Sequence, residues 1–131
     1  MSAGHSGTPL PRKLGVRAGS RVLITGAPAD FVPDFPFHSR AGRAPYDVVL
    51  LFCPDLAALE HGWPAAYRRI GPAGALWVAW PKKSSGVATD LSDQVVRSSA
   101  LDHGLVDVKV AAIDQTWSGL KLVRRLADRA G

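Results

Sequence analysis

A loop rich in lysine and serine follows the most apolar stretch of this chain and carries its clearest groups for binding chemistry. Ammonium groups and hydroxyls between the end of a buried strand and the start of a helix favour an anion, because unpaired N–H groups of a first helical turn attract negative charge. The spacing is not that of a P-loop. The alternative interpretation is a solvated basic loop. The predicted anion site consists of Lys82, Lys83, Ser84, Ser85 and Gly86.

Three further residues are predicted to border the same ligand. Trp80, at the end of the apolar run, could form an aromatic wall for a flat ligand such as a base, or it could pack in the core. Trp77 lies three residues earlier, so it points to the opposite face of a strand and is assigned to the core. Gly26 follows another strand, and Trp117 lies in a predicted turn. Ligands of open α/β sheets bind beyond the carboxyl ends of the strands, so one crevice is predicted.

Other reactive side chains are not arranged for metal binding or catalysis. The four histidines have no ligand spacing, and Cys53 is the only cysteine, so no metal site is predicted. Ser84 or Ser85 as a nucleophile would need a histidine base, and no Gly-x-Ser-x-Gly motif is present. Cys53 is interpreted as a small core residue. Catalysis is not evident from these patterns, and the cofactor is left open.

The composition is typical of a single domain with a basic surface. We predict one α/β domain over residues 8–131, because 131 residues, 47% of them apolar, can bury an independent core after a flexible segment of residues 1–7. The formal charge of +5 favours anionic partners such as nucleotides, nucleic acid or phosphorylated metabolites. A basic cluster near the C-terminus could contact phosphates or form a solvated strand edge. It contains Lys121, Arg124, Arg125 and Arg129.

The cellular location is predicted from what the sequence lacks. A single thiol cannot form an internal disulfide, which favours a reducing cytoplasm. Residues 1–7 contain no basic segment followed by an apolar stretch, so no secretory signal is expected. No apolar run approaches the roughly 20 residues that a membrane helix needs, so no membrane partner is expected.

The first half of the chain alternates short strands with irregular segments. Thr8 followed by proline predicts a capped helix that ends at Gly15. Strands are predicted over 21–25 and 46–53, the second with the continuous apolar run expected when helices cover both faces. Between them, residues 35–39 could form a short edge strand, the one place in a sheet where proline is tolerated.

Two helices are predicted in the second half. An apolar stripe over 56–70 has the helical period, but Gly62 and Pro64 interrupt it and predict a kink or two short helices. After the lysine loop, Thr89 or Asp90 is predicted to cap another helix.

The remaining apolar runs predict the rest of the sheet. A strand over 75–80 lies between the two helical segments. Runs over 106–112 and 120–123 are separated by a turn over 115–119, which predicts an antiparallel hairpin. The predicted fold class is therefore α/β: a single Rossmann-like domain with a mostly parallel sheet and a C-terminal antiparallel hairpin.

Seven sequence segments carry a resemblance to known proteins. They include Ser-Gly-Thr-Pro-Leu at 6–10 and Trp-Val-Ala-Trp-Pro-Lys-Lys at 77–83, and the others are 13–15, 48–51, 86–91, 105–109 and 116–121. This pattern resembles a family of small bacterial proteins of unknown function over nearly the whole chain. The order of elements resembles the S-adenosylmethionine-dependent methyltransferase fold in reduced form.

The methyltransferase resemblance implies a cofactor site at the end of the first strand. Such enzymes usually place an acidic residue and a glycine-rich turn there. Here residues 23–28 hold one glycine and no acid. The resemblance also implies an acidic residue after the second strand for the ribose hydroxyls, which has no clear counterpart in residues 35–43, and Asp30 or Asp34 could substitute for it only outside a recognisable frame.

Three functions follow from these patterns. The first is a Rossmann-like domain that binds an anionic, nucleotide-like ligand at the strand-end crevice. The second is a divergent S-adenosylmethionine-dependent methyltransferase. The third is a nucleic-acid-binding module, for which neither an RNP-like aromatic pair nor zinc-knuckle spacing is present. The oligomeric state is left open.

Overall fold

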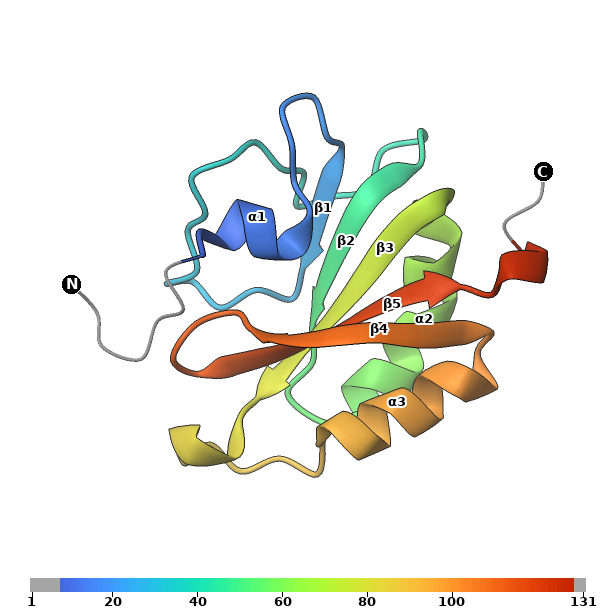
Figure 1. Cartoon of the computed structure of the whole chain (residues 1–131). Helices are drawn as coiled ribbons and strands as arrows, with labels where there is room; N and C mark the ends of the chain where they lie inside the picture. Colours follow the sequence, from blue (N-terminus) through green and yellow to red (C-terminus); the bar gives the residue numbers. More distant parts are fainter. Residues whose placement is uncertain (1–7, 129–131) are drawn as a thin grey trace.

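A five-stranded mixed sheet forms the centre of the molecule, with helices on both faces (Figure 1). The computed structural model describes residues 8–128, so the prediction for residues 1–7 lies outside the described part of the chain. The strand order is β1-β2-β3-β5-β4, and the first three strands run parallel. The bounds are β1 Val22–Thr25, β2 Tyr46–Phe52, β3 Ile70–Pro81, β4 Leu105–Ala112 and β5 Trp117–Arg124.

The last strand lies between two earlier ones. β5 pairs antiparallel with both β3 and β4, so β4 becomes the outer strand although it precedes β5 in the chain. The predicted mostly parallel sheet with a C-terminal antiparallel hairpin is therefore confirmed. The hairpin does not merely extend the sheet, because its second strand contacts the parallel part.

Two helices cover one face of the sheet. These are α2 (Leu56–Arg69) and α3 (Asp93–Asp102), whose apolar side chains share a core with Leu76, Val78 and Trp80 of β3. This face is apolar at alternate strand positions because successive side chains point to opposite sides. Trp77 accordingly faces the other side, which confirms the predicted division of the two tryptophans.

A buried polar network joins α2 to α3. The indole Nε1 of Trp63 donates to Ser99 Oγ at 2.7 Å, and the Ser99 hydroxyl donates to Glu60. His103 stacks on the Trp63 indole with ring centroids 5.2 Å apart, and its Nδ1 donates to the Ser99 carbonyl. Each buried donor thus has an acceptor, so the polar groups do not weaken the packing of the two helices.

The opposite face is covered by α1 (Leu10–Leu14) and by the irregular segment after β1. Leu14 is 1% exposed, and the Trp77 indole Nε1 donates to its carbonyl at 3.1 Å. Gly15 ends the helix in the left-handed conformation, with φ of 80°. Five residues are too few for an independent helix, so α1 depends on these contacts.

Three local predictions need correction. The N-cap of α1 is Pro9 instead of Thr8, and no side chain caps that helix. Of the two alternatives predicted for residues 56–70, a kink or two short helices, the second is wrong, because the segment is one helix with Pro64 inside it. The predicted edge strand over 35–39 is reduced to a single bridge, in which His38 exchanges backbone hydrogen bonds with β1. Only one residue of that segment pairs because four prolines lie in the loop between β1 and β2 that carries it.

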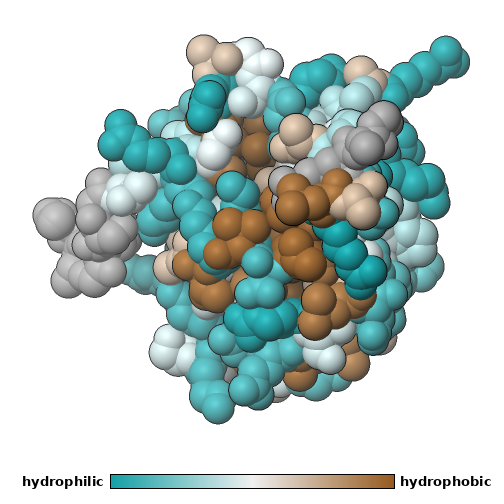
Figure 2. All heavy atoms as spheres, turned by 45° about the vertical axis from the view of Figure 1, so that its right-hand side comes forward, coloured by the Kyte–Doolittle hydropathy of each residue, from teal (hydrophilic) through white to brown (hydrophobic). Residues whose placement is uncertain are grey.

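The outer strand β4 is exposed along its free edge. Val108 and Val110 are 53% and 50% exposed. Figure 2 shows apolar atoms interspersed with hydrophilic ones across the middle of the molecule. A register shift between Asp107 and Lys109 leaves Val108 without a partner on β5. Such a bulge distorts a strand edge and discourages pairing with another chain.

The described helices are all too short or too polar to cross a lipid bilayer.

Candidate functional site

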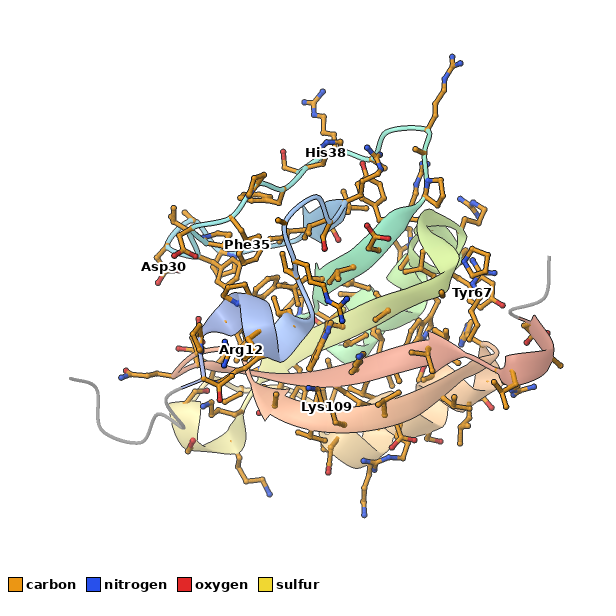
Figure 3. All side chains as sticks on the ribbon, turned by 45° about the horizontal axis from the view of Figure 1, so that its top comes forward. Arg12, Asp30, Phe35, His38, Tyr67 and Lys109 are labelled. Atoms are coloured by element: carbon orange, nitrogen blue, oxygen red, sulfur yellow. The ribbon has the colours of Figure 1, made fainter. Side chains whose placement is uncertain are left out.

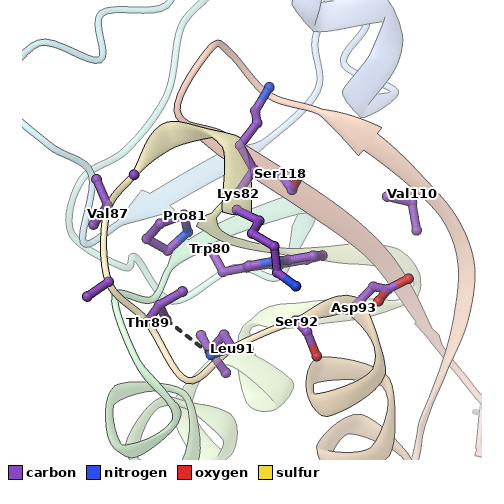
Figure 4. A pocket seen from close by; sticks show the side chains of 13 residues that line it. Trp80, Pro81, Lys82, Val87, Thr89, Leu91, Ser92, Asp93, Val110 and Ser118 are labelled. Atoms are coloured by element: carbon purple, nitrogen blue, oxygen red, sulfur yellow. Dashed lines mark hydrogen bonds between the residues drawn. The ribbon is translucent and has the colours of Figure 1, made fainter.

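A hollow of about 530 Å³ opens at the carboxyl end of β3, where the sheet meets the start of α3 (Figure 4). The short 3₁₀ helix η1 (Lys83–Ser85) borders it on one side and the β4–β5 hairpin on another. Four of the eight predicted site residues line it: Trp80, Lys82, Lys83 and Gly86. Ser118 of the hairpin also lines it, and residues that the sequence reasoning missed contribute the rest of the wall, notably Thr89, Leu91, Ser92, Asp93 and Val110.

The lysine loop is held in place by its own backbone and by the hairpin. The Lys82 N–H donates to the Thr116 carbonyl at 2.8 Å, which ties the loop to the start of β5. The Ser85 hydroxyl donates to the Lys82 carbonyl at 2.6 Å and accepts from the Val87 N–H. Gly86 then reverses the chain with φ of 78°. Ser85 therefore shapes the loop, and neither it nor Ser84 is among the residues that line the hollow.

The hollow has an apolar floor and charges of both signs at its rim. Trp80 is 5% exposed and Leu91 is 6% exposed, so the floor is continuous with the core. Lys82 enters from the end of β3 and Asp93 from the first turn of α3 (Figure 4). Asp93 lies 3.9 Å from Arg97, while no salt bridge within residues 8–128 involves Lys82. Lys82 is thus not engaged in a salt bridge there, whereas the Asp93 carboxylate shares its charge with Arg97 in a long, partly exposed ion pair.

The cap of α3 differs from the prediction. Ser92 is the N-cap, and its hydroxyl accepts from the Val95 N–H, so neither Thr89 nor Asp90 caps this helix. Acidic Asp93 occupies the first turn, which is the signal that could have located this start in the sequence. Because Ser and Asp already satisfy this terminus, the positive charge offered to a ligand comes from the lysines.

Thr89 and Asp90 instead bind to the start of α2. The Thr89 hydroxyl donates to the Pro54 carbonyl at 2.7 Å, and Asp90 Oδ1 accepts from the Leu56 N–H at 2.8 Å. Asp55, the N-cap of α2, accepts from the Ala58 N–H at 2.9 Å. Two carboxylates therefore occupy the position where an anion would bind to this helix.

The ends of β1 and β2 form the place where a ligand crevice is expected, because their connections leave toward opposite faces of the sheet. Here that place is filled by protein. The backbone of Gly26 passes so close to β2 that a Cβ on it would lie 2.7 Å from the Phe52 carbonyl oxygen. The Phe52 ring packs edge-to-face on Phe31 and Trp117, with centroids 4.9 and 5.0 Å away.

Gly26 and Trp117 do not line the hollow at the end of β3. Trp117 begins β5, where it pairs with Pro81, so the prediction that it lies in a turn is wrong. Both residues pack around Phe52 on the α1 face of the sheet. They support the strands that position the hollow.

The predicted C-terminal basic cluster does not form one surface. Arg124 donates to the Tyr67 and Ile70 carbonyls at 2.9 and 2.7 Å, at the end of α2. Arg125 donates to the Leu101 carbonyl of α3, and Lys121 lies on the α1 face, opposite Trp77 in the register. Arg129 lies outside the described residues.

Cys53 is a core residue at the end of β2 and is 0% exposed. Burial, with a further contribution from the carboxylate of Asp55, raises the pKa of the Cys53 thiol from 9.0 to about 12. The thiolate, which is the nucleophile, is thus disfavoured near neutral pH. Among the described residues, no three side chains of His, Cys, Asp or Glu gather where a metal ion could bind.

The raised pKa of Cys53 predicts a loss of stability in alkali. Between pH 9 and pH 12 the folded chain keeps the thiol proton while the unfolded chain releases it. The free energy of unfolding should be insensitive to this group below pH 9 and then fall by up to about 1.4 kcal/mol per pH unit. Urea unfolding at pH 8 to 11 measures this, with Cys53→Ala as the control. Parallel curves for the two proteins would contradict it.

Comparison with known proteins identifies the fold class. No protein-family model matches the sequence, and no curated protein matches it. Ribosomal protein L11 methylase from Lactobacillus delbrueckii subsp. bulgaricus is similar in structure, with TM-score 0.51 and 11% identity over 87% of this chain and 62% of that one. LepI in complex with SAM gives TM-score 0.53 and 12% identity over 88% of this chain and 39% of LepI. The chain thus spans less than two thirds of either protein.

These similarities define a methyltransferase-like α/β fold, in agreement with the resemblance seen in the order of elements. A complex of a LepI variant with SAH and a substrate analogue gives a TM-score of 0.52 at 12% identity. At such identity the comparison concerns the fold alone. The resemblance of the sequence motifs to a small bacterial family stays a prediction.

Proposed function

We propose that this chain binds S-adenosylmethionine, or a closely related adenosyl compound, in the hollow at the end of β3. The observation that carries this proposal is the pair of opposite charges at the rim, Lys82 and Lys83 on one side and Asp93 on the other. S-adenosylmethionine carries a carboxylate, an ammonium group and a sulfonium cation. A polyphosphate would satisfy the lysines but would be repelled by the carboxylate.

The hollow matches such a ligand in size and chemistry. Its volume of about 530 Å³ falls in the usual range for small-molecule sites. The lysine ammonium groups would hold the carboxylate of the ligand, and Asp93 would face its cationic groups. The apolar surface formed by Trp80, Leu91 and Val110 would cover the adenine ring.

The fold supports the same ligand, because LepI, which has this fold, was solved with SAM. The proposed location differs from the one that the resemblance implies. Gly26 and Phe52 leave no room at the end of β1, so we place the ligand at the end of β3. Transfer of the sulfonium methyl group to an acceptor at the mouth of the hollow would make the chain a divergent methyltransferase.

An anionic nucleotide is the second candidate. It is favoured by the adjacent lysines, neither of which forms a salt bridge within the described chain. The two candidates differ in what they require of Asp93. Replacing that carboxylate should weaken S-adenosylmethionine binding, whereas it should strengthen nucleotide binding by removing a repulsion.

Isothermal titration calorimetry with S-adenosylmethionine, S-adenosylhomocysteine, AMP and ATP tests the proposal. We expect S-adenosylmethionine to bind, and Lys82→Ala and Asp93→Asn each to weaken it about 10- to 100-fold, the effect of losing one charge-assisted hydrogen bond. Arg68→Ala, on the exposed part of α2, is the control and should leave affinity unchanged. Binding of ATP alone, strengthened by Asp93→Asn, would establish the nucleotide. No heat with any ligand at millimolar concentration would overturn both.

A further inference from the structure

A second, basic surface lies on the face of the sheet opposite α2 and α3. Two neighbouring hollows of about 440 and 490 Å³ flank α1 where it meets the β4–β5 hairpin. We call them together the α1 groove. Five cationic side chains line it: Arg12, Lys13, Arg17, Lys109 and Lys121.

The strand register explains why these side chains share one face. Lys109 of β4 pairs with Lys121 of β5, which pairs in turn with Trp77 of β3. Residues paired across antiparallel strands point to the same side. Because Trp77 faces α1, both lysines do so too, and the Lys109 ammonium lies 5.9 Å from the centre of the Trp77 ring. Figure 3 shows Arg12 on α1 near Lys109 on the adjoining strand.

The positive charge of the groove is not neutralised by the chain itself. No salt bridge within residues 8–128 involves any of the five cations. Asp47 is the one acidic residue among those that line the two hollows, and it already accepts a hydrogen bond from the Arg21 N–H at 2.7 Å. Lys13 donates to the Ala112 carbonyl at 3.1 Å, which fixes α1 against β4. The groove is thus a preformed concave surface with excess positive charge.

We propose that the α1 groove binds the phosphate backbone of a single-stranded nucleic acid. The two hollows, of about 440 and 490 Å³, are small recesses that can receive one nucleic-acid strand but not a duplex. The lining residues come from β4, β5, β3 and β2, which are neighbours in the sheet, so the recess crosses four strands. At ordinary strand spacing this is roughly 14 Å, enough for about three phosphates of an extended strand. A linear polyanion can follow such a recess, whereas a flat lipid surface would meet only its rim.

The absence of exposed aromatic rings among the residues lining the two hollows predicts the kind of recognition. Stacking of bases on aromatic side chains adds affinity in many single-strand-binding proteins. In the α1 groove the Trp77 ring is 0% exposed beneath Lys109. Binding should therefore depend on phosphates, with little preference for base sequence and with strong dependence on salt.

This inference is independent of the ligand proposed for the hollow at the end of β3. That hollow contains Lys82 and Lys83 at the strand end, and neither lysine lines the α1 groove. The double variant Lys82→Ala/Lys83→Ala should consequently bind oligonucleotide within about twofold of the wild-type affinity. If one of the two sites does not bind its ligand in its own assay, the result for the other site still stands.

Fluorescence anisotropy with a labelled 15-nucleotide dT oligomer and a labelled 15-nucleotide U oligomer tests the proposal. With three phosphate contacts, the slope of log affinity against log salt should be about −2, so affinity should fall about twentyfold from 50 to 200 mM salt. The triple variant Arg12→Gln/Arg17→Gln/Lys121→Gln should lose at least tenfold in affinity and flatten this slope.

A matched variant separates the groove from overall charge. Arg40→Gln/Arg43→Gln/Arg68→Gln removes the same charge from exposed positions outside the groove and should change affinity by less than threefold. Equal losses in both variants, or no binding at 50 mM salt, would overturn the proposal. So would groove-dependent binding to vesicles containing phosphatidylserine with no binding to either oligomer. Thermal unfolding of each variant verifies that the fold is retained.

Discussion

Replacing Trp77 with alanine is expected to lower the free energy of unfolding by about 3 to 5 kcal/mol, the usual cost of deleting a large buried aromatic side chain. Trp77 is 0% exposed and lies at the centre of β3, between β2 and β5. Its indole also donates to the Leu14 carbonyl. The substitution therefore removes core packing and the hydrogen bond that holds α1.

Urea unfolding followed by fluorescence and circular dichroism measures this effect. Trp77→Phe is the matched variant, since it keeps most of the packing and loses the N–H donor. Its cost should be about 1 to 3 kcal/mol, the penalty for a buried carbonyl left without a partner together with a small cavity. A loss below about 1.5 kcal/mol in Trp77→Ala would show that α1 and the sheet do not depend on this side chain.

Gly26→Ala is expected to destabilise the fold by about 2 to 5 kcal/mol, for two separate reasons. The residue has φ of 73°, where a side chain costs about 1 to 2 kcal/mol. Its Cβ would also lie 2.7 Å from the Phe52 carbonyl oxygen, a backbone atom that can move only if β2 moves. Overpacking of this kind costs about 1 to 3 kcal/mol more.

Gly86→Ala separates the two reasons. Gly86 has a similar φ of 78°, but a Cβ there would meet nothing within 4 Å. Gly86→Ala should lower the free energy of unfolding only by the cost of the left-handed conformation, about 1 to 2 kcal/mol. Thermal or urea unfolding of the two variants side by side gives the difference. Equal losses would mean that the close approach of Gly26 to β2 is relaxed at little cost.

The buried strands could be predicted from the sequence because their signal is local. Val48, Val49 and Leu50 form a continuous apolar run, and each is at most 3% exposed in the structure. The residues from Leu76 to Trp80 also form a continuous apolar run and are buried. Helices and the irregular segment after β1 cover the two faces of these strands, so side chains on both faces must be apolar. A continuous apolar run of this kind can be recognised in a short window of sequence.

The site could be predicted only in part because its remaining residues are fixed by distant contacts. Thr89 and Asp90 are good caps by type, but their partners are Pro54 and Leu56, more than thirty positions earlier. Once these two residues are engaged, Ser92 becomes the cap. No local pattern distinguishes the three candidates.

The place of Trp117 illustrates the same limit for the sheet. The sequence predicts a turn over 115–119, since the apolar alternation resumes only at Leu120. In the structure β5 begins at Trp117, because β5 is inserted between β3 and β4 and Pro81 extends the ladder to that residue. The hairpin therefore contributes Ser118 to the lining of the hollow, and Trp117 does not line it.

The burial of Cys53 gives this chain a reporter of its own internal motion. It is the only thiol, it lies at the junction of β2 and α2, and no reagent can reach it in the closed state. Every alkylation event therefore records an opening of that junction, in the way that amide exchange records an opening of a hydrogen bond. The labelling rate of the native chain, without any engineered cysteine, would give the opening equilibrium beside the proposed ligand site. A ligand bound at the end of β3 should slow it.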